Sequence, residues 1–222
     1  MMNALINQYK FTNDHSFSAA SAVRPLSLND YIGQELIKDQ ARLKINLSRK
    51  NGTPIIHTLL LGFAGAGKTT LAKIIASEVG ASFHECMAAN IKNTKDLFDL
   101  IDRNVKPNSI LFIDEIHALK KDVQEALYTI MEDFKYFKNG GSGSTVIRNI
   151  PPFTVIGATT HAGNLNQPFL ERFGWKPTLQ AYSNNEMTEL ITKAAWSRYT
   201  ISIGRDVAES LAKISQNTPR KA

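Results

Sequence analysis

The segment Gly62 to Thr69 matches the pattern G-x-x-x-x-G-K-[ST], which is typical of loops that hold the phosphates of a nucleotide. Glycines let such a loop bring its N–H groups close to an anion, and the helix that follows directs free N–H groups and a partial positive charge at the same point. Lys68 supplies an ammonium group for the β- and γ-phosphate oxygens, and Thr69 supplies a hydroxyl for Mg²⁺. The sequence therefore predicts a site for ATP and Mg²⁺ here.

An acidic pair, Asp114 and Glu115, follows the apolar run 110–113. Carboxylates at the end of a buried strand lose hydration, so they usually have a cationic partner. Asp114 can hold Mg²⁺ through water, and Glu115 can orient and polarise the water that attacks a phosphate. The alternative is that both acids only cap a short helix over 116–119. The P-loop upstream favours the catalytic interpretation.

A threonine and two arginines extend the same chemistry. Thr160 ends another apolar run, 154–158, where its hydroxyl can contact the γ-phosphate or the water. Arg172 and Arg220 can stabilise charge on the transferred phosphoryl group, and such an arginine can come from a neighbouring subunit. Considered alone, an arginine is more often a surface ion-pair residue. The order in which the motifs occur favours the functional interpretation.

Apolar runs alternate with helix-like segments along the chain. We expect strands at 55–61, 82–87, 109–113 and 154–158, and helices at 68–79, 94–103 and 122–134. This alternation predicts an α/β fold with a parallel sheet and helices on both faces. Ligands of such sheets bind at the carboxyl ends of the strands, and both the P-loop and the acidic pair follow a strand end.

Two regions depart from this alternation. Residues 136–150 favour a β-hairpin with a flexible Gly/Ser-rich tip, and a disordered loop is the alternative. After Ala181 the pattern is helical, with a capping box from Ser183 to Glu186 and a second helix after Gly204. We expect a flexible arm over 1–20, a large ATPase domain over 21–180 with the hairpin inserted at 135–150, and a partial helical lid domain over 181–222.

Composition sets weaker bounds. The chain has 222 residues and a formal charge of +6, which favours polyanionic partners only weakly because the basic residues are scattered. No apolar run approaches the length of a membrane span, and the arm over 1–20 lacks the apolar core of a secretory signal. Cys86 is the single cysteine, which suits a cytoplasmic setting and predicts a buried, inert thiol.

The order of the motifs resembles that of AAA+ ATPases, and more narrowly of the RuvB family, hexameric motors that drive branch migration of Holliday junctions. The matching stretches cover about residues 22 to 220: Arg24-Pro25, Tyr31-Ile32-Gly33-Gln34, Leu111 to His117, Met131 to Phe134, Pro151 to Thr160, Arg172-Phe173-Gly174 and Thr218-Pro219-Arg220. The Met-Glu-Asp-Phe and Pro-Pro-Phe-Thr stretches are far more specific to this family than the P-loop is.

The resemblance implies a role for each matching residue. The adenine pocket would comprise Val23, Arg24, Tyr31 and Ile32. The phosphates and Mg²⁺ would be held by Gly62, Gly65, Ala66, Gly67, Lys68, Thr69 and Thr70, with Asp114 on the metal side and Glu115 as the catalytic carboxylate. Thr160 would be the first sensor, Arg172 the finger that reaches a neighbour's ATP, and Tyr182, Pro219 and Arg220 would close the site from the lid. Glu132, Asp133 and Phe134 enter the nucleotide site on the family motif alone.

The resemblance also implies a hexameric ring, DNA as a partner, and binding of the junction protein RuvA through the hairpin. Departures from the family pattern are His161 and Leu170 in place of arginines, Asn217 in place of glycine, and a shorter hairpin. The sequence ends soon after Arg220, so we expect the rest of the lid and the winged-helix DNA-binding domain to be missing.

Three functions are compatible with these patterns. The first is a RuvB-like motor that hydrolyses ATP at subunit interfaces to drive branch migration in recombination and repair. The second is a clamp-loader-like or assembly ATPase, in which the nucleotide acts as a switch. The Met-Glu-Asp-Phe and Pro-Pro-Phe-Thr stretches favour the motor over this second function. The third is a chain that binds nucleotide without hydrolysing it.

Overall fold

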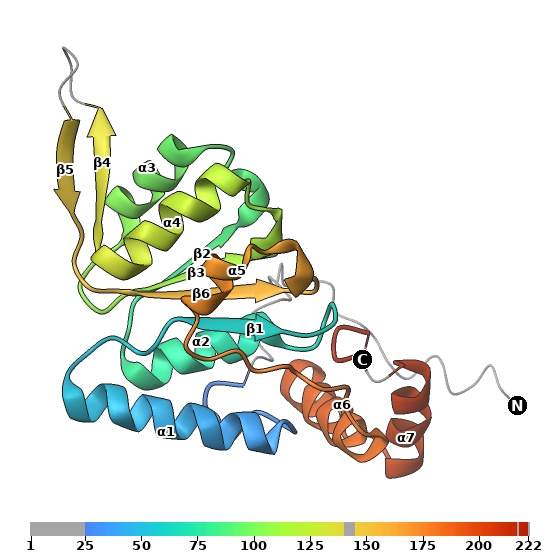
Figure 1. The fold of residues 1–222 in the computed structure, drawn as a ribbon. Helices are drawn as coiled ribbons and strands as arrows, with labels where there is room; N and C mark the ends of the chain where they lie inside the picture. The colour runs from blue at the N-terminus through green and yellow to red at the C-terminus, as the bar shows by residue number, and fades with distance from the viewer. Residues whose placement is uncertain (1–24, 140–144, 217, 222) are drawn as a thin grey trace, which may run out of the picture.

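A parallel sheet forms the centre of the molecule. The computed structural model describes residues 25–139, 145–216 and 218–221. The four strands lie in the order β1-β6-β3-β2 (Figure 1). Their bounds are β1 (Thr58–Leu61), β2 (Phe83–Met87), β3 (Ile110–Asp114) and β6 (Thr154–Thr159). All pairs are parallel, so the carboxyl ends of the strands meet at one edge of the sheet.

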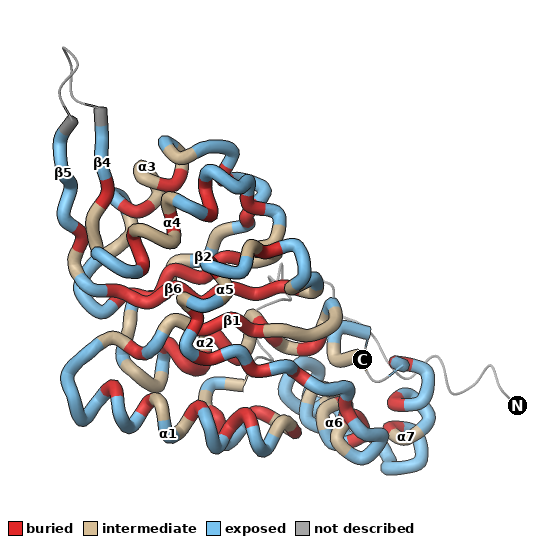
Figure 2. The backbone as a smooth tube through the Cα atoms, in the orientation of Figure 1, coloured by how far each residue is buried: buried red, intermediate tan, exposed pale blue. Residues whose placement is uncertain are grey.

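Helices cover both faces of this sheet (Figure 1). On one face lie α1 (Glu35–Asn51) and α2 (Lys68–Val79); on the other lie α3 (Thr94–Asn104), α4 (Lys121–Asp133) and the short α5 (Gln167–Glu171). Side chains of a strand alternate between the two faces, so Ile110 and Phe112 join one core while Leu111 and Ile113 join the other. Both cores appear as buried segments along the sheet in Figure 2. Burial on both faces explains why β3 is a continuous apolar run.

The predicted α/β fold is confirmed, and α2 has the predicted bounds. The other predicted elements agree to within a few residues; the largest difference is β1, which begins at Thr58 although the expected run began at Ile55. The short helix α5 was not predicted, and two larger elements were also missed. One is α1, and the other is an extended edge at 175–178, where Leu59 N–H donates to the carbonyl of Trp175 (2.8 Å) and Leu61 N–H to that of Pro177 (2.9 Å).

The segment 135–149 is a β-hairpin, as predicted, made of β4 (Lys135–Asn139) and β5 (Thr145–Asn149); the predicted tip at 140–144 lies outside the described residues. The hairpin projects away from the sheet at the end opposite the C-terminal helices (Figure 1). At its base, Tyr136 is buried and stacks on Phe98 with the ring centroids 4.1 Å apart. Farther out, the side chains of Phe137, Val146 and Ile147 are about half exposed.

The C-terminal part is helical, with α6 (Asn184–Tyr199) and α7 (Arg205–Ile214), which we call the lid helices. The predicted capping box is present: Ser183 Oγ accepts from the N–H of Glu186, and the Glu186 carboxylate accepts from the N–H of Ser183. These helices share a small core of their own, formed by Tyr182, Met187, Ile191, Ala208 and Ala212. The arm at 1–20 lies outside the described residues. Across the residues that the structure describes, every helix is too short or too polar to cross a membrane.

Candidate active site

The P-loop turns tightly between β1 and α2. Gly65 and Gly67 have φ angles of 83° and 100°, which are left-handed values that favour glycine, and α2 begins directly at Lys68. The ammonium group of Lys68 donates to the carbonyl oxygens of Gly62 (2.8 Å) and Phe63 (3.0 Å). An ammonium group has three N–H donors, so one remains for a further acceptor. The free N–H groups at the start of α2 face the same side as the loop.

A cleft of about 950 Å³ opens beside this loop. It is lined by most of the predicted site residues: Tyr31, Ile32, Gly65, Gly67, Lys68, Thr69, Thr70, Asp114, Glu115, Tyr182, Pro219 and Arg220. Residues far apart in the sequence therefore meet at the carboxyl edge of the sheet, between the sheet and the lid helices. Of the predicted P-loop residues, Gly62 and Ala66 do not line the cleft; Ala66 is fully buried beneath the loop.

Charges of both signs act on Lys68. Burial lowers the pKa of its ammonium group, the carboxylates of Glu115 and Asp114 oppose that shift, and the Arg220 guanidinium adds to it. The carboxylates of the acidic pair are thus close enough to act electrostatically on Lys68. A triphosphate would bring several negative charges to a site that has Lys68, Arg220 and a helix N-terminus on its walls.

Two tyrosines close the cleft above the P-loop. A Cβ atom on Gly67 would lie 2.5 Å from the Tyr31 hydroxyl and 3.6 Å from that of Tyr182. Burial raises the pKa of Tyr31 well above its ordinary value, and the nearby Tyr182 raises it further. A Cβ atom on Gly65 would meet Thr218 and Arg220, at 2.9 and 3.0 Å. The C-terminal segment therefore packs directly on the loop.

The carboxylate of Glu115 has polar neighbours from two strand ends. Its Oε2 lies 3.3 Å from Thr160 Oγ1, which follows β6, and 3.1 Å from His117 Nδ1, in the turn after β3. The backbone of Glu115 is left-handed, with φ of 49°, and its N–H donates to Asp114 Oδ1 at 3.0 Å. A left-handed conformation of a residue other than glycine costs about 1–3 kcal/mol and is concentrated at functional sites.

Comparisons with known proteins agree with this geometry. The family model "Holliday junction DNA helicase RuvB P-loop domain" matches residues 23–179. The chain belongs to the RuvB family. It is 38% identical over 224 residues to the "Holliday junction branch migration complex subunit RuvB" of a Nitratiruptor species, an alignment that covers all of this chain and 66% of that relative.

Solved structures of the RuvB family show the same fold. The Thermotoga maritima RuvB Holliday junction branch migration motor superposes with a TM-score of 0.79 at 38% identity, covering 90% of this chain and 62% of that one. A substitution mutant of the same protein gives a TM-score of 0.80. The chain thus spans about two thirds or less of the length of these relatives. As a RuvB-family P-loop domain, it is a nucleotide-binding protein.

Some predicted residues lie away from the cleft. Arg172, at the end of α5, forms an ion pair with Glu132 (2.7 Å) and donates to the Tyr128 hydroxyl (2.6 Å). Asp133 pairs with Lys135 at 3.4 Å. Phe134 ends α4 with a left-handed backbone and packs near the rings of two other core residues, His57 and Phe153. Val23 and Arg24 lie outside the described residues.

The residues present suit ATP and Mg²⁺. Thr69 and Asp114 both line the cleft and offer a hydroxyl and a carboxylate, which are the oxygen ligands that Mg²⁺ prefers. Mg²⁺ at phosphate sites commonly uses only one or two protein carboxylates and takes its remaining ligands from phosphates and water. Among the described residues there is no cluster of three or more acidic, histidine or cysteine side chains suited to a metal.

Sequence reasoning missed one wall of the cleft. Lid-helix residues line it, including Leu190, Lys193, Ala194 and Arg198, together with Asp30 near the start of the described chain. The sequence pattern places Leu190 and Ala194 on one apolar face of this helix but assigns that face no role in the site. Sequence reasoning also gave no role to His117 and His161. The only signal in the sequence was position: His117 lies two residues after Glu115, and His161 directly follows the paired threonines.

Proposed function

We propose that this chain is the ATPase portion of a RuvB-type motor, which hydrolyses ATP at the interfaces of a hexameric ring and drives branch migration of Holliday junctions. The observation that carries the proposal is the cleft itself: P-loop, acidic strand end and lid residues converge there in one chain. The similarity to RuvB proteins extends over the whole chain, which favours a motor over a clamp-loader-like switch.

Each group would have a defined task in phosphoryl transfer. Thr69 and Asp114 hold Mg²⁺, which neutralises charge on the phosphate oxygens when bound. Lys68 and Arg220 place positive charge at the phosphates. Glu115 orients and polarises the attacking water, and Thr160 lies within hydrogen-bond reach of the same carboxylate. Catalysis of this kind depends mainly on positioning and charge, which a preformed cleft supplies.

We propose that Arg172 acts on the ATP of a neighbouring subunit. Its side chain is about one third exposed and lies outside its own cleft, held by Glu132 and by the face of the Tyr128 ring. A guanidinium held in this way keeps a fixed direction while part of it remains open to a partner. Glu132 and its neighbours Asp133 and Phe134 would then belong to the subunit boundary, close to the finger they support.

The hairpin is the proposed contact for a RuvA-like partner. Three half-exposed apolar side chains, Phe137, Val146 and Ile147, lie on a projection that the stacked Tyr136 anchors at its base. Phe137 and Ile147 are paired in the hairpin register and share one face, while Val146 lies on the other; an exposed apolar pair of this kind favours a protein interface. Changing Ile147 to Asp should abolish capture by an immobilised RuvA-type protein and leave the melting temperature unchanged. We also propose that the protein acts in the cytoplasm, on DNA, and that residues 181–222 form part of a lid domain.

The decisive experiment measures phosphate release by the wild-type chain and two matched glutamate variants. Glu115→Gln should retain binding of a fluorescent ATP analogue while turnover falls by about 10²–10⁴-fold, because an amide cannot accept the proton of the water. Glu125→Gln, which changes an exposed residue of α4, should leave both quantities as they are. Undiminished turnover by Glu115→Gln would refute the assigned role.

Coupling to DNA needs its own measurement. Turnover is compared with four-way junction DNA, linear duplex and no DNA, each with a RuvA-type protein present, and separately with a ring clamp on linear duplex. A motor is expected to be stimulated most by the junction, because the partner recruits it there. Stimulation by a ring clamp but not by the junction would favour the clamp-loader-like alternative.

A further inference from the structure

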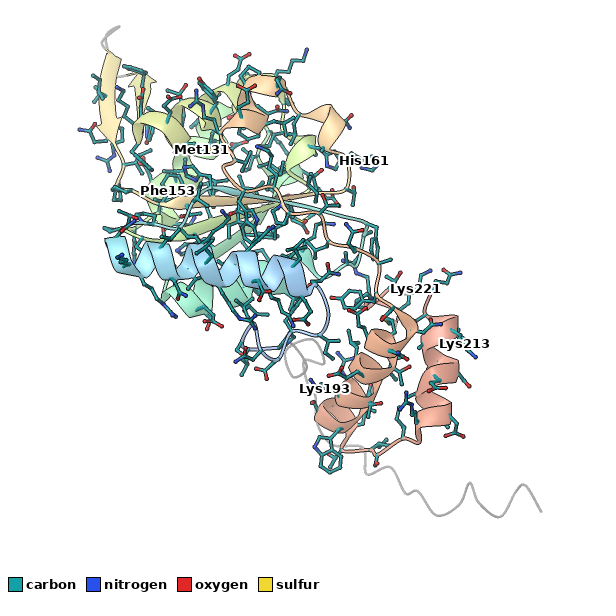
Figure 3. All side chains as sticks on the ribbon, turned by 60° about the horizontal axis from the view of Figure 1, so that its bottom comes forward. Met131, Phe153, His161, Lys193, Lys213 and Lys221 are labelled. Atoms are coloured by element: carbon teal, nitrogen blue, oxygen red, sulfur yellow. The ribbon has the colours of Figure 1, made fainter. Side chains whose placement is uncertain are left out.

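Two histidines surround the catalytic carboxylate, and neither has a role in the mechanism above. His117 Nδ1 lies 3.1 Å from Glu115 Oε2 and 2.9 Å from Thr159 Oγ1. His161 Nδ1 lies 2.7 Å from the hydroxyl of Thr160, which itself contacts Glu115. The two rings are 5.2 Å apart. Figure 3 shows His161 on the side of the sheet nearer the lid helices, away from Met131 and Phe153 at the hairpin side.

The direction of these hydrogen bonds follows from donor and acceptor capacity. An ionised carboxylate only accepts, so the 3.1 Å contact between His117 Nδ1 and Glu115 is a hydrogen bond when Nδ1 carries a proton, which Thr159 Oγ1, at 2.9 Å, then shares. Thr160 has a single hydroxyl proton. When that proton is donated to Glu115, the contact with His161 requires His161 Nδ1–H to donate to Thr160 Oγ1. With the protons placed in this way, both histidines support Glu115: His117 directly, and His161 through the hydroxyl of Thr160.

The local backbone fixes His117 in this position. It lies in η3 (Ile116–Ala118), the turn that directly follows Glu115. Ile116 is fully buried, and Ala118 N–H donates to the Glu115 carbonyl at 2.8 Å. The His117 side chain is only 19% exposed, whereas that of Glu115 is 35% exposed. A rigid, largely buried donor thus holds a more exposed acceptor, which is the arrangement expected of a supporting residue.

We propose that His117 is a positioning residue for Glu115. Its Nδ1–H, together with the Thr160 hydroxyl, fixes one carboxylate oxygen, so that Glu115 keeps a single orientation while it polarises the attacking water. His161 supports the same carboxylate through Thr160. This inference rests on the ATPase function proposed above. It assigns the kinetic benefit to orientation, which affects turnover and leaves nucleotide binding unchanged.

Three variants test the assignment. His117→Leu removes the donor, whereas His117→Asn keeps an N–H at the position of Nδ1. His84→Leu is the matched control, because His84 lies on β2 and its Nε2 has no hydrogen-bond partner within the described chain. For His117→Leu we expect kcat to fall about ten- to a hundredfold, as small misplacements of a reacting group can cost that much. KM for ATP and the Kd of a fluorescent ATP analogue should change less than about twofold, and Asn should restore most of kcat.

A second measurement does not depend on turnover. Long-range ¹H–¹⁵N spectra of the histidine rings report which nitrogen carries the proton, and we expect Nδ1–H for His117, with a shift that changes in Glu115→Ala. A bare Nδ1 would overturn the inference. So would an undiminished kcat in His117→Leu, a parallel loss of analogue binding and thermal stability, or an Asn variant as slow as Leu. Absence of turnover in the wild type would refute the proposed ATPase function. The ¹H–¹⁵N spectra would then still show whether His117 Nδ1 carries the proton that bonds Glu115.

Discussion

The substitution Gly67→Ala should damage the P-loop in two separable ways. Gly67 has φ of 100°, and a side chain there forces a residue into a left-handed conformation that costs about 1–2 kcal/mol. The new Cβ would also lie 2.5 Å from the Tyr31 hydroxyl. Overpacking of this kind costs about 1–3 kcal/mol. Together we expect a loss of about 2–5 kcal/mol in unfolding free energy, with weaker nucleotide binding.

Two companion variants separate the strain from the clash. Gly52, the left-handed residue after α1, has nothing within 4 Å of a built Cβ, so Gly52→Ala should show the strain alone. Tyr31→Phe removes the clashing oxygen. Its hydrogen bond to the Ala66 carbonyl is long, at 3.5 Å, so the single change should cost at most about 1 kcal/mol. In the double variant with Gly67→Ala, about 1–3 kcal/mol of the loss should return.

Urea unfolding of the four variants and the wild type measures these free energies, and titration with a fluorescent ATP analogue measures binding. The geometry would be refuted if Gly67→Ala were no more destabilising than Gly52→Ala. It would equally be refuted if Tyr31→Phe added its cost to that of Gly67→Ala, because additivity means that the two positions do not touch.

Three further predictions concern other parts of the molecule. His57 accepts from Val155 N–H through Nδ1 and contacts the Met131 carbonyl through Nε2; burial lowers the pKa of His57, and the Met131 carbonyl opposes that shift. The stability that His57 contributes should therefore be present above its unfolded-state pKa of 6.5 and be lost as the pH falls through the lowered folded-state pKa. Melting curves recorded from about pH 7.5 to 5 would detect this loss, and His57→Gln should make the melting temperature less dependent on pH. Arg172→Ala subunits mixed with Lys68→Ala subunits should regain part of the turnover that each lacks alone, and no rescue at any ratio would contradict a shared site. Burial, and then Glu85, raise the pKa of Cys86 to about 12, so its thiol should react slowly with a disulfide reagent at about pH 8 and rapidly once urea unfolds the chain.

The sequence predicted the parts of the fold that follow from local pattern. β3 and β6 are buried on both faces and were recognisable as continuous apolar runs. α2 has its left-handed glycine caps at both ends, Gly67 and Gly80, so even its bounds were predicted. The edge at 175–178 was missed because Pro177 and the surrounding polar residues hide it. Proline has no N–H to donate to a neighbouring strand, so within sheets it occurs mainly at edges, such as the edge at 175–178.

The amphipathic helix α1 was missed although its pattern is regular. Its buried residues are Ile37, Lys38, Ala41, Ile45 and Ser48, and two of these five are polar. The Lys38 side chain is buried, and its ammonium group donates to the Tyr31 carbonyl at 2.8 Å. Lys38 can be buried because the Tyr31 carbonyl, seven residues earlier in an irregular segment, accepts from its ammonium group. Because polar residues occupy two of the buried positions, the apolar residues alone do not show the helical period.

The wall formed by the lid helices could not be predicted from local pattern. Leu190 and Ala194 follow the helical period that places core residues, yet they line the nucleotide cleft. Which neighbour an apolar face meets depends on how the lid lies against the sheet. That arrangement is set by contacts between distant segments, such as the pair of hydrogen bonds between Gln34 and Gln180, at 2.8 and 3.0 Å.

The register of the central strands explains why the catalytic groups meet. Leu61, the last residue before the P-loop, is paired with Thr159, and Ile113, the last before the acidic pair, is paired with Gly157. A Cβ atom on Gly157 would lie 2.7 Å from Ile116 and 3.1 Å from Leu59. The glycine therefore lets the turn after Glu115 pack directly on β6. Any side chain at 157 would push Ile116 outward and with it His117, so the orientation of the Glu115 carboxylate depends on the absence of a side chain at Gly157 in the neighbouring strand.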